Sequence, residues 1–250
     1  MSVTCGFFSV ACALTWLLGL PTAVAWMRHD APSPLAVACA GLSAFGPLLA
    51  ALVFVVPERR LGALFGRFRT NPGWVALALA APFVIHLMAT TLYACLGGRP
   101  AAWFHPPVHA EQLAALIVFP LGEEFGWRGF AYPRMVARFG IVRGSLGLGV
   151  AWGVWHLMYS ITSQAAAFDP FVFGLGMLEL PLYSLLIAWV FERSNRSMAV
   201  ALAFHAGAHL DHVEQAPKSE LGLHVLHLVV LGALAFVAAR SLRCEAPVRE

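Results

Sequence analysis

Long apolar stretches dominate this chain, and they are interrupted where proline, glycine and charged residues cluster. The stretches show no period-two alternation, so a membrane barrel is not expected and helices are the remaining way to satisfy the backbone in lipid. The seventh stretch is too short to span a bilayer alone, and we expect it to continue toward Val213 inside a helical bundle. The expected helices cover Val3–Trp26, Leu35–Val56, Trp74–Leu96, Glu111–Tyr132, Ser145–Ile161, Phe171–Phe191, Met198–Leu210 and Leu221–Ala239.

Composition supports lipid as the main solvent of the chain. Of its 250 residues, 60% are hydrophobic and 12% are charged, whereas soluble domains have about 45–50% apolar and about 25% charged residues. We therefore predict an all-α polytopic membrane bundle of about eight transmembrane helices, with residues 1–250 forming a single transmembrane domain. The net charge of +3 is too small to indicate nucleic acid as a partner. The first apolar stretch has no early lysine or arginine, so we expect an uncleaved helix.

Basic residues are concentrated in alternate loops. Twelve lie in one set of loops and in the C-terminal tail, whereas the other set holds only Arg28, Arg99 and Lys218. The positive-inside rule then predicts that both termini are cytoplasmic. The short loops and the lack of a targeting element favour a prokaryotic plasma (inner) membrane. The twelve are Arg59, Arg60, Arg67, Arg69, Arg134, Arg138, Arg143, Arg193, Arg196, Arg240, Arg243 and Arg249.

Several ionisable residues lie inside the apolar stretches. A charge at the centre of a bilayer costs about 3 kcal/mol even on lenient insertion scales, so such residues face the bundle interior and commonly mark function. Those with the most informative spacing are in the fourth, fifth and seventh stretches. We interpret the others, His86, Glu179, His224 and His227, as mainly structural.

The fourth stretch contains two adjacent acids and an arginine. Glu124 and Arg128 are four residues apart, so they share one helix face and can pair. Glu123 points about 100° away from Glu124, so that pair does not neutralise it. A buried clamp between helices explains Glu124 and Arg128 well, but it leaves Glu123 unexplained. Glu123 is therefore a candidate general base.

Three histidines accompany these acids. His156 follows two tryptophans in an apolar helix, and a lone histidine there is more often a core residue than a functional one. His205 and His209 are four residues apart and share a face. That spacing suits two metal ligands or two donors directed at one oxygen.

These residues lie in three segments, GEEFGWRGFAYPR, WGVWH and FHAGAH, which resemble the three motifs of a known family. The family is CPBP (CAAX protease and bacteriocin-processing, or ABI), a group of intramembrane proteases that includes the Rce1-like CAAX prenyl endopeptidases. The resemblance covers residues 111–213, the motif-bearing catalytic core. It implies that Glu123 is the catalytic glutamate and that His156 helps it to hold the attacking water. It also implies that Glu124 and Arg128 form a supporting pair and that His205 stabilises the oxyanion.

The last motif departs from the family pattern. His209 occupies the place where the family often has asparagine, although a suitably protonated histidine can also donate a hydrogen bond. The family carries a metalloprotease label, but a glutamate–histidine arrangement can also work without an ion. Asparagine is a poor zinc ligand, whereas histidine is a good one. A divalent metal such as zinc therefore stays an open expectation, with Glu123, His156, His205 and His209 as the candidate ligands.

The leading hypothesis is hydrolysis of a peptide bond in a membrane-associated or lipid-modified substrate, within a cavity of the bundle. Glu123, His156, His205 and His209 would be catalytic. A second hypothesis is a non-catalytic membrane protein, such as an immunity factor or scaffold, in which the polar cluster only joins helices. A third is a small proton-coupled transporter that uses buried Glu and His as a relay, although no inverted repeat supports it.

Overall fold

The computed structural model describes residues 3–57, 61–104, 110–163, 170–210 and 220–244. Within these residues the chain is helical and has no β-strand, so the predicted all-α class is confirmed. The elements are α1 (Val3–Met27), α2 (Pro34–Ser43), α3 (Gly46–Val55), α4 (Leu61–Phe65), α5 (Pro72–Cys95), α6 (Ala110–Glu124), η1 (Phe125–Ala131), α7 (Tyr132–Phe139), α8 (Ile141–Ser163), α9 (Pro170–Arg193), α10 (Met198–Ala208) and α11 (Leu221–Cys244).

The second expected helix differs from the prediction because it is broken. Its two halves, α2 and α3, are bent by 59° at the break between Ser43 and Gly46. Pro47 lies in the first turn of α3, where its ring is compatible with a helix start but not with a continuous helix running through it. The expected continuation of the seventh helix toward Val213 lies outside the described residues.

Not every helix is long and apolar enough to cross a membrane. Within the described residues α1, α5, α9 and α11 meet that requirement, and the bent pair α2–α3 could form a fifth span. The helices that carry the polar motifs, α6, α8 and α10, are not among them. The chain is thus a polytopic membrane bundle, whereas a count of eight spans stays a prediction.

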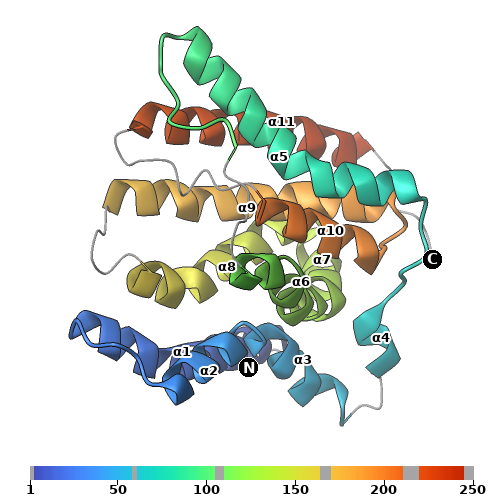
Figure 1. The fold of residues 1–250 in the computed structure, drawn as a ribbon. Helices are drawn as coiled ribbons and strands as arrows, with labels where there is room; N and C mark the ends of the chain where they lie inside the picture. The colour runs from blue at the N-terminus through green and yellow to red at the C-terminus, as the bar shows by residue number, and fades with distance from the viewer. Residues whose placement is uncertain (1–2, 58–60, 105–109, 164–169, 211–219, 245–250) are drawn as a thin grey trace.

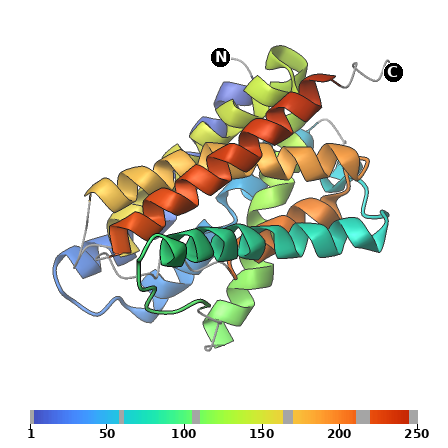
Figure 2. The same ribbon diagram turned by 90° about the horizontal axis from the view of Figure 1, so that it is seen from above.

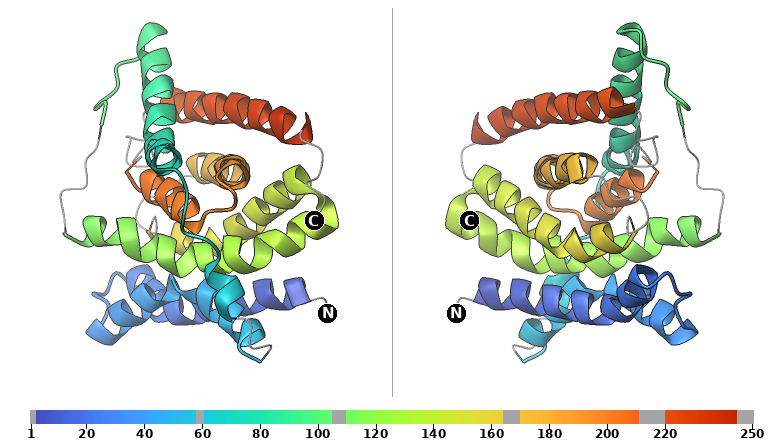
Figure 3. Two further views of the ribbon diagram at one scale, coloured as in Figure 1. Left: turned by 90° about the vertical axis from the view of Figure 1, so that its right-hand side faces the viewer. Right: turned by 90° about the vertical axis from the view of Figure 1, so that its left-hand side faces the viewer.

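The helices are stacked in layers (Figure 1). α1, α2 and α3 form one outer face, followed by a layer with α6, η1, α7 and α8, then by α9 and α10, and finally by α5 and α11. The same order is visible in both views of Figure 3. Seen from above in Figure 2, the C-terminal end of α5 lies beside the start of α11. The motif-bearing helices are therefore enclosed between the outer layers.

Basic segments that are distant in the sequence meet at one end of the bundle. The Met198 N–H donates to the Arg67 carbonyl over 2.6 Å, joining the chain before α5 to the start of α10. The Arg193 guanidinium donates to the Ser241 hydroxyl, also over 2.6 Å, joining the end of α9 to the end of α11. This agrees with the alternation of loop charges, although the assignment of this end to the cytoplasm stays a prediction.

Candidate active site

Two glycines seat the first motif against the N-terminal helices. A Cβ atom on Gly126 would collide with the backbone carbonyl of Pro47 in α3, and one on Gly129 would collide with the carbonyl of Leu64 in α4. This close approach holds one side of η1 against α3 and α4 and leaves the other side free to face α8, α9 and α10.

The helix widens immediately after the two acids. Over Phe125–Ala131 it has the wider π geometry, and the Tyr132 N–H that follows donates to the Trp127 carbonyl five residues back. Such widened turns occur frequently at functional sites. Here the widened turn begins directly after the two acids and contains Arg128.

The Glu123 carboxylate is buried and is held by two indoles. Its Oε2 accepts hydrogen bonds from Trp152 Nε1 at 2.7 Å and from Trp127 Nε1 at 3.3 Å. Its Oε1 lies 3.9 Å from Nε2 of His205, beyond the usual N–H···O range of about 2.7–3.2 Å. One oxygen is thus fixed, while the other faces the His205 imidazole without a direct hydrogen bond to it.

Glu124 links the first motif to the third. Its Oε1 accepts from Arg128 at 3.1 Å and from Nδ1 of His205 at 2.8 Å. Arg128 also donates to the Ser184 hydroxyl of α9 at 3.3 Å. The predicted pair is therefore present, and it also orients the His205 ring so that Nε2 points toward Glu123.

His156 is held by the two tryptophans of its own helix. Its Nδ1 donates to the Trp152 carbonyl over 3.0 Å, and its ring makes an edge contact with Trp155, with 4.7 Å between ring centroids. Trp155 in turn donates to the Thr15 hydroxyl of α1 at 2.7 Å, and Thr15 donates to the Ser43 carbonyl at 2.8 Å. Helices outside the motifs thus support the His156 ring.

The imidazoles of His205 and His209 stack, with centroids 5.1 Å apart and an interplanar angle of 20°. His209 lies at the C-terminal cap of α10, where its backbone N–H donates to the carbonyls of His205 and Ala206. The two rings share one face of the helix, as the four-residue spacing predicts.

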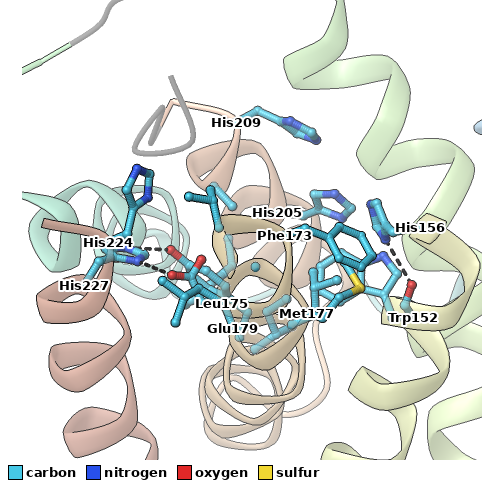
Figure 4. A pocket seen from close by; sticks show the side chains of 17 residues that line it. Trp152, His156, Phe173, Leu175, Met177, Glu179, His205, His209, His224 and His227 are labelled. Carbon is cyan, nitrogen blue, oxygen red and sulfur yellow. Dashed lines mark hydrogen bonds and ion pairs between the residues drawn. The ribbon is translucent and has the colours of Figure 1, made fainter. Parts of the chain in front are cut away.

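A pocket of about 220 Å³ lies beside these residues. In Figure 4, Trp152, His156 and His205 lie at one end and Glu179, His224 and His227 at the other, with Phe173, Leu175 and Met177 around the middle. Glu123 does not line the pocket itself. It lies behind Trp152 and His205, both of which contact it and both of which line the pocket.

The four candidate metal ligands do not form a ligand set. Within the described residues, no group of three or more His, Cys, Asp or Glu side chains is arranged to hold a metal ion. Nδ1 of His205 is hydrogen-bonded to Glu124 and Nδ1 of His156 to the Trp152 carbonyl, which leaves Nε2 of each ring as the nitrogen that could bind an ion.

Three motifs thus meet at one place, but the site contains groups that the sequence did not predict. Trp127 is four residues after Glu123, so its shared face was readable from the spacing, although its hydrogen bond was not predicted. The Trp152 donor to Glu123 and the Ser184 contact to Arg128 come from other helices and have no distinctive sequence signal. Glu179 and His227, interpreted above as structural, line the same pocket. The signal for these two was their presence as ionisable residues in apolar helices.

The fold and the site define a class: a polytopic helical membrane protein that buries a glutamate–histidine cluster beside a pocket. Residues 106–210 match the model of a family described as Type II CAAX prenyl endopeptidase Rce1-like. Over 98 residues, the chain is 26% identical to CAAX prenyl protease 2 of Methanococcus maripaludis, a match covering 37% of this chain and 36% of that protein. The chain therefore aligns with about a third of the length of that relative. The family resemblance indicated by the three motifs is confirmed over this region.

Proposed function

We propose that this chain is an intramembrane endopeptidase that hydrolyses a peptide bond in a membrane-associated substrate. The observation that carries the proposal is the gap of 3.9 Å between Glu123 Oε1 and His205 Nε2, which adjoins the pocket through His205. The similarity to CAAX prenyl endopeptidases over residues 106–210 supports the same reaction class. A lipid-modified peptide is the finer expectation for the substrate.

In the proposed reaction, water between Glu123 and His205 attacks the scissile carbonyl carbon. Glu123 Oε1 takes the proton from the water, while the two indole N–H groups keep Oε2 in place. The carbonyl π electrons move onto oxygen to give a tetrahedral oxyanion. The C–N bond then breaks, and the proton held by Glu123 passes to the leaving amine.

The oxyanion requires hydrogen-bond donors already in place. His205 is the first candidate, because Glu124 accepts from its Nδ1 and, in the protonated ring, Nε2–H is directed toward the water position. In that form the two carboxylates are balanced by Arg128 and His205. His209 lines the same pocket and is the further donor. His156 also lines it, but its Nδ1–H is used on the Trp152 carbonyl, so Nε2 of the neutral ring is an acceptor that helps to hold the attacking water. The proposed step uses no metal ion.

The test is Glu123→Gln, which retains an oxygen that can accept from both indoles but cannot take a proton. Purified protein in proteoliposomes is incubated with a panel of membrane-anchored reporter peptides, one of them farnesylated, and the products are identified by mass spectrometry. We expect the variant to lose about 10²–10⁴-fold in rate, the usual contribution of general base catalysis. Unchanged cleavage by Glu123→Gln would remove Glu123 from this role.

The matched control is Glu192→Gln, at the far end of α9. Glu192 accepts from Tyr132 and Arg196 and does not line the pocket, so wild-type activity is expected. If wild-type protein cleaves none of the peptides, a scaffold or immunity role gains support. Proton-coupled uptake in the same proteoliposomes would instead favour a transporter.

A further inference from the structure

The pocket has a second polar wall, formed by residues outside the three motifs. His227 Nδ1 lies 2.9 Å from Glu179 Oε1, and the Tyr183 hydroxyl lies 3.3 Å from His227 Nε2. Glu179 and Tyr183 come from α9 and His227 from α11; we call these three residues the far-wall triad. In Figure 4, Glu179 and His227 lie across the pocket from His156 and His205.

The hydrogen bonds define what this wall can bind. A carboxylate only accepts, so Nδ1 of His227 carries the proton between it and Glu179. In the neutral ring, Nε2 then accepts from the Tyr183 hydroxyl. Both polar protons of the triad are used within it. Toward any further partner, the second oxygen of Glu179 and the oxygen of Tyr183 can only accept hydrogen bonds.

The charge of this wall, like its hydrogen-bond acceptors, favours a ligand that donates hydrogen bonds and is positively charged. With histidines neutral, the triad has a formal charge of −1, and the residues that line the pocket include neither lysine nor arginine. The Glu179 side chain is 14% exposed, whereas that of His227 is fully buried. A carboxylate removed from water without a cation is unfavourable, so a positively charged partner would stabilise it.

We propose that the far-wall triad is a specificity subsite for a positively charged side chain of the substrate, an ammonium or a guanidinium. Its role in cleavage rests on the proposed peptidase function, with the scissile carbonyl at the His205 end. The apolar residues between the two walls, Phe173, Leu175 and Met177, suit the methylene stem of a lysine or arginine.

The size of the pocket supports a single side chain as the occupant. Its volume of about 220 Å³ is below the range of about 300–1,000 Å³ that is typical of sites for drug-sized ligands. The selected basic residue is therefore expected within a residue or two of the scissile bond.

The test measures binding separately from cleavage. Protein carrying Glu123→Gln, which is expected to cleave about 10²–10⁴-fold more slowly, is titrated with ten-residue alanine–leucine peptides that carry one lysine at each position in turn. The comparison peptides have norleucine at the same position. In at least one register we expect the lysine peptide to bind about tenfold more tightly or better, as for a hydrogen bond to a charged group. Adding Glu179→Gln should reduce that ratio to about one.

Glu192→Gln, in the same background, is the matched control. Glu192 lies on the same helix, and its side chain is also 14% exposed, but it does not line the pocket; the lysine preference should be unchanged. Tyr183→Phe keeps the carboxylate and removes one acceptor, so it should reduce the ratio only partly. It also keeps the test decisive if Glu179→Gln does not fold.

Two results overturn the subsite. One is equal binding of lysine and norleucine peptides in every register, and the other is a lysine preference that survives both Glu179→Gln and Tyr183→Phe. Cleavage by protein with the wild-type Glu123 distinguishes the two proposals. A lysine preference in binding with no cleavage of any peptide leaves the subsite and removes the peptidase function. Cleavage with no lysine preference leaves the peptidase function and removes the subsite.

Discussion

A methyl group at position 126 tests the contact that seats the first motif. Gly126 lies between Glu124 and Arg128 in the widened turn, and a Cβ there would collide with the Pro47 carbonyl of α3. Backbone atoms cannot rotate away as a flexible side chain can. Gly126→Ala must therefore push η1 and α3 apart, and the displacement would be felt at the carboxylates one turn away.

Two effects of opposite sign determine how much Gly126→Ala changes the free energy of unfolding. Alanine is favoured over glycine within a helix by about 0.5–1 kcal/mol, whereas overpacking a close contact costs about 1–3 kcal/mol. Because the collision is with backbone, we expect overpacking to dominate and to leave a net loss of about 1–2 kcal/mol. For a chain of this size each kcal/mol shifts the unfolding midpoint by about 2–4 °C, so we expect a decrease of about 2–8 °C.

The assay is thermal unfolding of purified protein in detergent, followed by tryptophan fluorescence at a constant scan rate. Gly174→Ala, within α9, is the control, because a Cβ there meets nothing within 4 Å. It should leave the midpoint unchanged or raise it slightly. The reasoning is refuted if Gly126→Ala unfolds at or above the wild-type temperature, or if both variants shift equally.

Three further predictions concern the supports of the site. Thr15→Val removes the bonds to Trp155 and Ser43 and should cost about 1–2 kcal/mol at typical values for membrane interiors; an unchanged unfolding midpoint would contradict it. Arg128→Met leaves the Glu124 carboxylate buried without the guanidinium and should lower the free energy of unfolding by about 3–5 kcal/mol. Adding Glu124→Leu should restore part of that loss; no recovery would show that the unpaired charge is not its cause. Elemental analysis should find substoichiometric zinc, and a chelator should leave peptide cleavage unaffected; one zinc per chain with chelator-sensitive activity would contradict the metal-free step.

The sequence was sufficient for the features that depend on local or summed properties. Hydropathy is a sum over neighbouring residues, so the positions of the long helices followed from it within a few residues. Spacing within one helix is equally local, and the pairing of Glu124 with Arg128 and the shared face of His205 and His209 follow from four-residue separations. The distribution of basic residues over the loops is also a property of the sequence alone. The hydrogen bonds that join basic segments at one end of the bundle agree with that distribution.

The tertiary structure decided everything that depends on which faces meet. No spacing in the sequence indicates that the Trp152 indole bonds to Glu123, or that His205 contacts both acids, because these contacts join residues from different helices. The contact of Pro47 with Gly126, which seats the first motif, likewise joins two helices and is not predicted by hydropathy. Glu179 illustrates the difference most clearly. Its sequence context marks only a buried acid in an apolar helix, whereas packing of α9 against α11 places it beside His227 on the wall of the pocket, because helix periodicity specifies a face but not its neighbour.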